Sequence, residues 1–369
     1  MTARRWSAPG RVNLIGEHTD YNAGFALPLA LPLRTTVEVT QRADGLVTAA
    51  SAAPGTEPVR FAVDTAPGDV TGWGAYVAGV FWALRKAGHA VPGADVRITS
   101  DVPTGAGLSS SAALECAVVV ALDQLGGLGL DPTTLALLAQ QAENAYVGAP
   151  TGAMDQMASM HGRDGHVILF DAHHLTAEPV PCDLAAAGLA LLIVDTRAPH
   201  RHVDGEYGAR RATCEAAAAT LGVATLREIQ GHDVDAVLTR LGDDEPARRR
   251  VRHVLTENQR VLDTVALLRQ GRVREIGPLL TASHVSLRDD YEVTVAELDV
   301  AVDAALGAGA LGARMTGGGF GGSVIALVED TAVAAVADAV TSAFAEHGFV
   351  EPAAFTARPA AGAGVDQDG

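Results

Sequence analysis

The chain has 369 residues, 48% of them hydrophobic and 19% charged, and carries a formal net charge of −17. This composition is typical of a soluble globular protein with two domains or one large one. The acidic balance argues against a nucleic-acid partner, because phosphate backbones are bound by clustered Lys and Arg.

Apolar periodicity and the positions of Gly and Pro predict a mixture of strands and helices. In chain order we expect a strand that ends at Gly16, a strand at 35–42, a helix at 73–88, a strand at 96–103, helices at 110–127 and 133–148, and strands at 165–171 and 189–196. The region 205–310 is expected to be mainly helical, with an exposed charged stretch at 243–252. A strand at 321–330, a helix at 331–347 and a frayed tail at 360–369 complete the prediction.

Strands and helices do not alternate strictly, so the predicted fold class is α+β. We place the division between two domains near 180–186, which gives domains 1–183 and 184–369.

The cysteines and apolar runs indicate a soluble cytoplasmic protein. No signal peptide is recognisable, and runs such as GLALLIV at 188–194 are far shorter than the roughly 18 residues of a membrane span. The three cysteines, Cys116, Cys182 and Cys214, are odd in number and lack metal-ligand spacing. Lys86 is the only lysine, so phosphate chemistry here cannot use a lysine in a glycine-rich loop.

The first motif, RVNLIGEHTDY at 11–21, concentrates hydrogen-bonding side chains in an otherwise apolar region. The second, DVPTGAGLSSSAALE at 101–115, places a glycine-rich turn and three serines before a helix. Glycines allow close approach of a ligand, and the N–H groups of a helix N-terminus favour an anion, so this loop suits phosphate. A serine-capped helix after a tight turn is the structural alternative. The loop is not a Walker A motif, which needs a lysine.

Two further motifs carry a carboxylate and a glycine run. In GAPTGAMDQMASMHG, at 148–162, Asp155 lies among small residues and methionines, which favours a paired or functional carboxylate over an idle one. A helix N-cap is its alternative role. RMTGGGFGGS, at 314–323, is either a sharp corner or a loop that lets a ligand approach the backbone.

The remaining candidates are histidines without the spacing of a zinc site, and we expect them to be exposed in loops. They are His166, His173, His174, His200 and His202.

Taken in order, the four motifs resemble those of the galactokinase family, within the GHMP small-molecule kinase superfamily. The pattern G-R-x-N-L-I-G-E-H-x-D-Y, at 10–21, is the element specific to that family. WGAYVAGV at 73–80, GEYGARRATCEAA at 205–217 and SHVSLRDDYEVTVAELD at 283–299 are also similar, so the resemblance extends from about residue 8 to about 365. It implies an N-terminal and a C-terminal α+β domain with the active site in the cleft between them.

The resemblance also implies roles for individual residues. Arg11 and Asp155 match a catalytic pair, and whether Asp155 is a general base or an orienting charge stays open. The sugar-binding residues are Glu17, His18, Asp20, Gly152 and Tyr207. The ATP-binding residues are Trp73 at the adenine and Gly105, Ala106, Gly107, Leu108, Ser109, Ser110 and Ser111 at the phosphates. Ser111 and Glu143 match a pair linked to Mg²⁺, and Gly317, Gly318 and Gly319 shape the far wall.

The implied activity is ATP-dependent phosphorylation of the anomeric hydroxyl of α-D-galactose, which yields α-D-galactose 1-phosphate in galactose catabolism. The expected partners are D-galactose and ATP with Mg²⁺, without nucleic acid or membrane, and the expected state is a monomer. Kinases for N-acetylgalactosamine, a uronic acid or arabinose, and a non-catalytic galactose and ATP sensor, are the alternatives. Homoserine and mevalonate kinases are disfavoured because they lack G-E-H-x-D-Y. Thr151 and Ser323 depart from a family pattern that often has cysteine, and the segment before Pro9 is shorter than usual.

Overall fold

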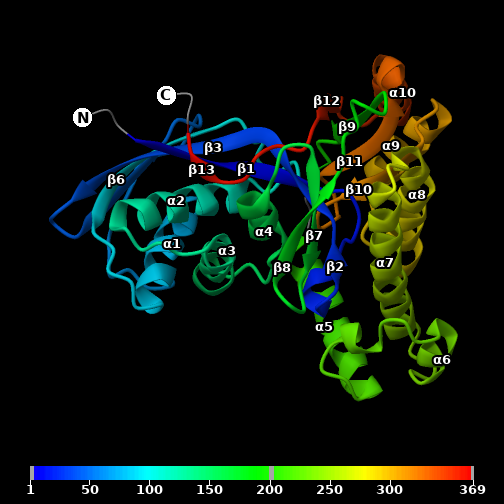
Figure 1. The fold of residues 1–369 in the computed structure, drawn as a ribbon, viewed down its shortest axis with the longest axis horizontal. Coiled ribbons are helices and arrows are strands. Elements are labelled where there is room, and N and C mark those ends of the chain that lie inside the picture. Colours follow the sequence, from blue (N-terminus) through cyan, green and yellow to red (C-terminus); the bar gives the residue numbers. More distant parts are fainter. Residues whose placement is uncertain (1–3, 199–202, 367–369) are drawn as a thin grey trace.

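The computed structural model describes residues 4–198 and 203–366, and forms two α+β halves that lie side by side (Figure 1). The N-terminal half contains a six-stranded sheet in the order β13-β1-β3-β6-β4-β5. Its strands are β1 (Arg5–Asn13), β3 (Pro28–Arg42), β4 (Leu46–Ser51), β5 (Val59–Ala62), β6 (Gly93–Ser100) and β13 (Gly364–Val365). All pairs are antiparallel except β4 with β6.

Helices cover one face of this sheet (Figure 1). They are α1 (Gly74–Lys86), α2 (Ser110–Gly126), α3 (Pro132–Gln141), the π-helix η2 (Ala142–Val147) and α4 (Met154–His161). Helix α2 is apolar almost all round and is buried over most of its length, as expected of a central helix. Asp131 caps α3 and Pro132 occupies its first turn, where the missing N–H costs nothing.

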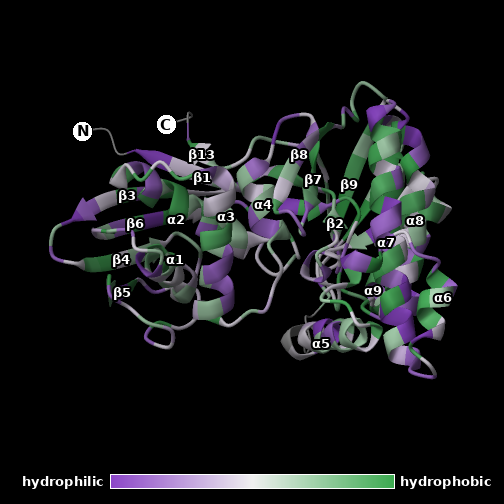
Figure 2. Cartoon of the chain, turned by 60° about the horizontal axis from the view of Figure 1, so that its bottom comes forward, coloured by the Kyte–Doolittle hydropathy of each residue, from purple (hydrophilic) through white to green (hydrophobic). Residues whose placement is uncertain are grey.

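The C-terminal half is built on a four-stranded antiparallel sheet in the order β10-β11-β9-β12. Its strands are β9 (Leu189–Asp195), β10 (Gly312–Thr316), β11 (Ser323–Glu329) and β12 (Ala353–Ala357). Its helices are α5 (Val203–Leu221), α6 (Val234–Thr239), α7 (Glu245–Arg269), α8 (Gly277–Ser286), the π-helix η5 (Leu287–Tyr291), α9 (Ala296–Gly307) and α10 (Val333–His347). Figure 2 shows hydrophobic and hydrophilic residues alternating along α7, which packs one face inward.

A small sheet joins the halves: β2 (Phe25–Ala26), β7 (His166–Asp171) and β8 (Thr176–Pro181). A shared core also links them, because Leu14 and Leu29 belong to one buried cluster with Val261 of α7 and Ile325 of β11. Within the described residues no helix is long and apolar enough to cross a membrane. The domain division near residue 183 falls between β8 and β9 and remains our proposal.

Three predictions about the fold need correction. The tail is ordered up to residue 366 rather than frayed, because β13 pairs with β1 and the N–H of Ala363 donates to the Ser159 carbonyl at 2.8 Å. The stretch 243–252 is not uniformly exposed, since it opens α7 and buries Arg250, which contacts Glu292 at 2.6 Å. The helix predicted at 133–148 changes at Ala142 into a π-helix, a form often found at functional sites.

Candidate active site

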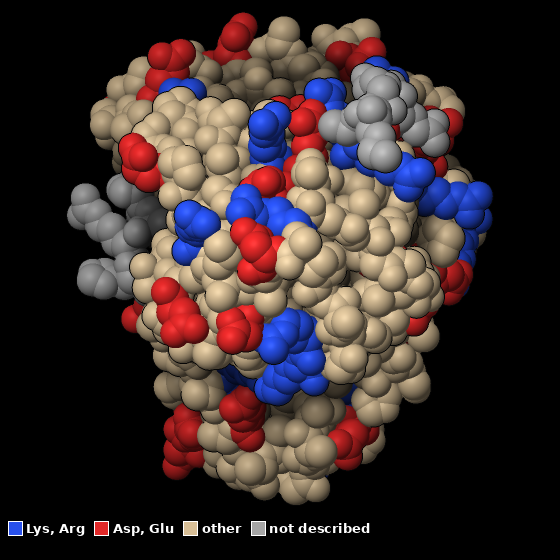
Figure 3. Space-filling view, turned by 90° about the vertical axis from the view of Figure 1, so that its left-hand side faces the viewer, with Lys and Arg blue, Asp and Glu red and all other residues tan. Residues whose placement is uncertain are grey.

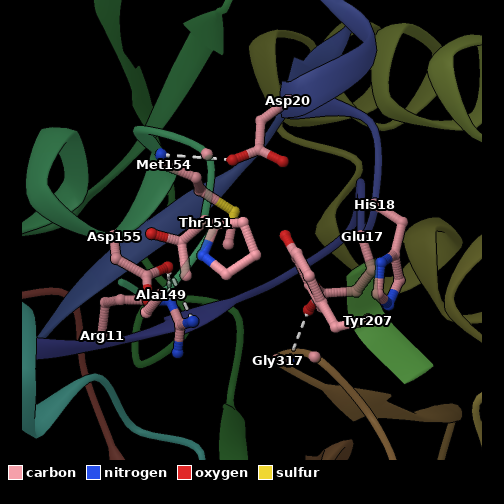
Figure 4. Close-up of a pocket in the computed structure, with 13 residues that line it drawn as sticks. Arg11, Glu17, His18, Asp20, Ala149, Thr151, Met154, Asp155, Tyr207 and Gly317 are labelled. Atoms are coloured by element: carbon pink, nitrogen blue, oxygen red, sulfur yellow. Dashed lines mark hydrogen bonds and ion pairs between the residues drawn. The ribbon is translucent and has the colours of Figure 1, made fainter. Parts of the chain in front are cut away.

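Arg11 of β1 and Asp155 of the first turn of α4 form a close ion pair (Figure 4). The Nε and Nη2 atoms of Arg11 both lie 2.7 Å from Asp155 Oδ1, and Nη1 donates to the Gly107 carbonyl at 2.7 Å. The Ser109 hydroxyl donates to the other carboxylate oxygen, Oδ2. The pair is therefore fixed between a strand, a helix and the serine loop.

The backbone around Arg11 explains why the strand and the serine loop meet. The N–H of Arg11 donates to the Leu108 carbonyl at 3.0 Å, and the β1–β3 register shifts between Pro9 and Arg11. A Cβ on Gly10 would lie 2.7 Å from the Leu108 oxygen, so this close approach requires glycine. Register shifts of this kind often redirect a side chain at an active site.

The serine loop, from Gly105 to Ser111, leads into the N-terminus of α2. Gly105, Gly107 and Ser109 have positive φ angles of 79°, 74° and 58°. Ser109 is the N-cap residue of α2 but makes no side-chain capping bond, so the capping explanation of this serine is wrong. The first N–H groups of the 17-residue helix α2 supply the positive dipole end that anions favour.

A cavity of about 180 Å³ opens beside the ion pair. It is smaller than the 300–1,000 Å³ typical of drug-sized ligands, so it suits a ligand of about one ring. The structure brings together nine of the predicted residues as its lining: Arg11, Glu17, His18, Asp20, Gly152, Asp155, Tyr207, Gly317 and Gly318. Ala149, Pro150, Thr151 and Met154 also line it and were not assigned a place in the site from the sequence.

Glu17 is buried and held by the C-terminal half. Its Oε1 accepts from the N–H of Gly317 at 2.7 Å and lies 3.5 Å from Nη1 of Arg314. Burial raises the pKa of Glu17, and the charges of Arg314 and Arg11 oppose this rise. Arg314 itself is fully buried and donates to the Asn13 carbonyl at 2.9 Å. Sequence reasoning missed this role of Arg314, although an arginine in an apolar strand before a glycine run is a usable signal.

His18 and Asp20 occupy the turn after β1. Burial lowers the pKa of His18 to about 3, so its ring is neutral at pH 7. Burial and the nearby charge of Asp155 raise the pKa of Asp20 to about 6. Asp20 Oδ1 accepts from the N–H of Tyr21 at 2.9 Å, and Oδ2 accepts from the N–H of Met154 at 3.4 Å.

Gly152 and Tyr207 complete the cavity wall. A Cβ on Gly152 would lie 1.7 Å from Asp20 Oδ2, so glycine is required here. The Tyr207 ring lies 5.3 Å from the His18 ring between centroids, and a Cβ on Gly318 would lie 3.6 Å from Tyr207.

Glu143 lies behind the serine loop and hydrogen-bonds Ser111, Gln156 and Thr151. Its Oε2 accepts from Gln156 Nε2 at 2.7 Å and from the Thr151 hydroxyl at 3.0 Å. Burial raises the pKa of Glu143, as does the charge of Asp155, while the hydrogen bond from Ser111 lowers it. The Glu143 carboxylate and the Ser111 hydroxyl offer the oxygen ligands that Mg²⁺ prefers. Water molecules and substrate phosphates usually supply the other ligands of such an ion. The described residues contain no group of three metal-ligating side chains, so those further ligands would have to complete the site.

The other predicted residues lie outside the cavity. Trp73 is half-buried at the start of α1 and packs against the N-terminal core, and Gly319 packs beneath the Val293 carbonyl. Ser323, at a departure from the family pattern, donates to the Ala106 carbonyl at 2.7 Å and so ties the glycine loop to the serine loop.

The prediction that the histidines lie exposed in loops is confirmed for some of them and wrong for one. His173 and His174 are exposed between strands, as expected, whereas His166 lies in β7 and is only partly exposed. His200 and His202 lie outside the described residues.

The two α+β halves with a serine loop and a close Arg11–Asp155 ion pair between them define a GHMP kinase. Family models match accordingly: GHMP kinases N terminal domain at 75–163, GHMP kinases C terminal at 264–346, and the galactokinase galactose-binding signature at 2–41. The chain is 55% identical to a galactokinase of Streptomyces coelicolor over 97% of its length and 93% of that protein. It is 52% identical to a galactokinase of Mycobacterium tuberculosis, over 97% and 98% of the two chains. The chain belongs to the galactokinase family.

Solved structures agree with this assignment. The crystal structure of Lactococcus lactis galactokinase complexed with galactose superposes with a TM-score of 0.93 at 35% identity, over 98% of this chain and 95% of that one. The Methanococcus jannaschii mevalonate kinase shares the fold alone, with a TM-score of 0.67 at 15% identity over 98% and 99%.

Proposed function

We propose that the chain transfers the terminal phosphoryl group of ATP to the anomeric hydroxyl of α-D-galactose, giving α-D-galactose 1-phosphate and ADP. The observation that carries the proposal is the Arg11–Asp155 pair, which lies at one side of a ring-sized cavity and is bonded directly to the serine loop. An acceptor hydroxyl beside Asp155 is therefore also next to the loop suited to phosphate.

Catalysis by this site rests on positioning and charge. Phosphoryl transfer needs alignment of the two substrates and neutralisation of developing charge more than covalent chemistry. Arg11 pairs with the Asp155 carboxylate and presents a positive charge beside the loop, while Asp155 accepts or orients the proton of the anomeric hydroxyl. Ser109 fixes the second carboxylate oxygen.

The nucleotide is assigned to the loop from Gly105 to Ser111, with Trp73 at the adenine. Ser111 and Glu143 would hold Mg²⁺ through their oxygens, and the bound ion would neutralise phosphate charge.

Sugar recognition is assigned to Glu17, His18, Asp20, Tyr207 and the backbone of Gly152. Their side chains converge on the cavity from both halves of the chain, with Gly317 and Gly318 at the far wall and Gly319 supporting it (Figure 4). Glu17 and Asp20 are hydrogen-bond acceptors when ionised, which matches the hydroxyl protons of a sugar.

Replacing Gly152 by alanine is expected to raise the KM for galactose at least about 10-fold, because the new methyl group must displace the Asp20 carboxylate or the sugar. Steady-state kinetics with ATP saturating measure this effect. The matched control is Gly205→Ala, in α5, where no atom lies within 4 Å of an added Cβ. An unchanged KM in Gly152→Ala would remove Gly152 from the sugar site.

The KM for galactose is expected to fall as pH rises through about 6. Asp20 has a raised pKa of about 6, so it is protonated below this pH and becomes a charged acceptor above it. The measurement is the KM for galactose between pH 5 and 8, and Asp20→Asn should remove the step. A wild-type KM that stays flat across this range would contradict the role given to Asp20.

The substrate is tested by ADP release with ATP and Mg²⁺ over a panel of sugars: galactose, glucose, talose, N-acetylgalactosamine, galacturonic acid and arabinose. Galactose is expected to have the highest kcat/KM. A higher value for another sugar would make the chain a kinase for that sugar, and ATP and galactose binding without turnover would make it a sensor.

We propose a cytoplasmic monomer without a nucleic-acid partner. Cys116, Cys182 and Cys214 are free and buried, as suits a reducing compartment. Figure 3 shows one face of the N-terminal half, on which basic and acidic side chains are interspersed. The basic side chains on this face do not gather into the cluster that binding a phosphate backbone requires.

A further inference from the structure

A chain of four side chains connects the sugar cavity to the interior of the C-terminal half. His18 Nδ1 lies 2.9 Å from the Tyr21 hydroxyl, which lies 2.8 Å from the Tyr291 hydroxyl. The Tyr291 hydroxyl in turn lies 3.2 Å from Sγ of Cys214. Tyr291 and Cys214 are fully buried, and the proposed phosphoryl transfer makes no use of either.

The other ring nitrogen of His18, Nε2, is buried and makes no hydrogen bond of good geometry among the described residues, while the backbone of Gly318, which lines the same cavity, is close enough to act on the ring. His18 also lines the cavity, and its ring faces Tyr207 there (Figure 4). A buried ring nitrogen without a partner is costly, so a ligand in the cavity is its natural partner. Whether Nε2 donates or accepts depends on which ring nitrogen carries the proton.

The chain of hydrogen bonds has two possible directions. In one, Nδ1 donates to Tyr21, Tyr21 donates to Tyr291, and Tyr291 donates to the sulfur of Cys214. In the other, the thiol donates to Tyr291, Tyr291 donates to Tyr21, and Tyr21 donates to Nδ1. The second direction pairs a phenol, which is the more acidic donor, with the basic imidazole nitrogen, so it forms the stronger bond at the histidine.

We propose that Tyr21 and Tyr291 are positioning residues that hold neutral His18 with its proton on Nε2, so that His18 donates a hydrogen bond to a hydroxyl oxygen of the sugar. This inference rests on the proposed function and deepens it. A sugar hydroxyl both donates and accepts, and the cavity already contains the carboxylate acceptors Glu17 and Asp20. A donor at His18 completes the complementarity.

Ring packing supports the positioning role. The Tyr291 ring packs against both His18 and His253, with centroid distances of 4.7 Å and 4.5 Å. His253 Nε2 lies 3.1 Å from the Glu17 carbonyl, and its Nδ1 lies 3.0 Å from the Ser286 hydroxyl. The ring of Tyr291 is thus fixed by α7 and by the turn that carries His18.

The test combines the tautomer of His18 with sugar kinetics. Long-range ¹H–¹⁵N NMR of the sugar-free, histidine-labelled protein distinguishes protonated from bare ring nitrogens, and the His18 signals are assigned from their loss in His18→Gln. We expect a protonated Nε2 in the wild type and a mixed or reversed tautomer in Tyr21→Phe and Tyr291→Phe. The KM for galactose should rise about 3- to 10-fold in both variants, with little change in kcat.

Tyr146→Phe is the matched control. It removes another buried tyrosine hydroxyl, which is bonded to Thr65 in the N-terminal half, and should leave the His18 signals and the galactose KM unchanged. A wild-type His18 protonated on Nδ1, or a tautomer unaltered in both tyrosine variants, would overturn the proposal. Because the tautomer is read without sugar, these results are distinguishable from failure of the proposed function, which would appear as a wild type that does not phosphorylate galactose.

Discussion

Replacing Asp155 by asparagine is expected to lower kcat by about 10²- to 10⁴-fold, the range typical of a lost proton acceptor. The amide has the same shape but cannot accept the anomeric proton as a carboxylate does, and it leaves the Arg11 charge unpaired. ADP release at saturating galactose and ATP measures the loss. Thermal unfolding and galactose binding should show that the protein remains folded and still takes up the sugar.

Asp164→Asn provides the matched control, because Asp164 is exposed and should tolerate the same change without loss of turnover. A near-normal kcat in Asp155→Asn would show that Asp155 does not act on the acceptor hydroxyl. In that case the ion pair with Arg11 would serve the structure alone.

Arg314→Met is expected to lower the free energy of unfolding by about 3–5 kcal/mol. This is the usual cost of removing one partner from a buried network of charged groups. Arg314 is fully buried, and its Nε donates to the Ser283 hydroxyl at 3.1 Å while Nη1 lies 3.5 Å from Glu17. Methionine fills similar space but leaves these acceptors unpaired. The galactose KM should also rise, because Glu17 loses a positioning charge.

Urea unfolding followed by circular dichroism measures the change in stability. Arg288→Met is the control, because Arg288 pairs with Asp289 at the surface and such pairs contribute roughly 0–1 kcal/mol. Equal destabilisation by the two substitutions would contradict the account of Arg314 as the buried link between Glu17 and the C-terminal half.

Local patterns in the sequence predict most of the elements of this fold. The alternation at 35–42 lies within β3, and the apolar spacing at 110–127 matches α2 almost to the residue. The errors arise where distant contacts decide the outcome. The tail of small residues becomes ordered because β1 offers an edge for β13 to pair with and the Ser159 carbonyl accepts from the N–H of Ala363, and no pattern within the tail indicates these partners.

In the candidate site, too, local motifs predict individual residues but not the contacts between distant parts of the chain. The motifs at 11–21 and 148–162 identify Arg11 and Asp155 as candidates, but their contact joins residues 144 positions apart. Glu17 is readable as a polar residue, whereas its support by Arg314 depends on a contact across nearly 300 positions. Tyr291 and Cys214 carry no local signal at all, since a buried tyrosine or cysteine in a helix usually belongs to a core.

The most direct test of the central claim is ³¹P NMR of the product formed from galactose, ATP and Mg²⁺. If Asp155 orients the anomeric hydroxyl toward the phosphate held by the serine loop, the signal should be that of α-D-galactose 1-phosphate, with one equivalent of ADP. Phosphate on another hydroxyl, or ADP and inorganic phosphate without a sugar phosphate, would contradict the account.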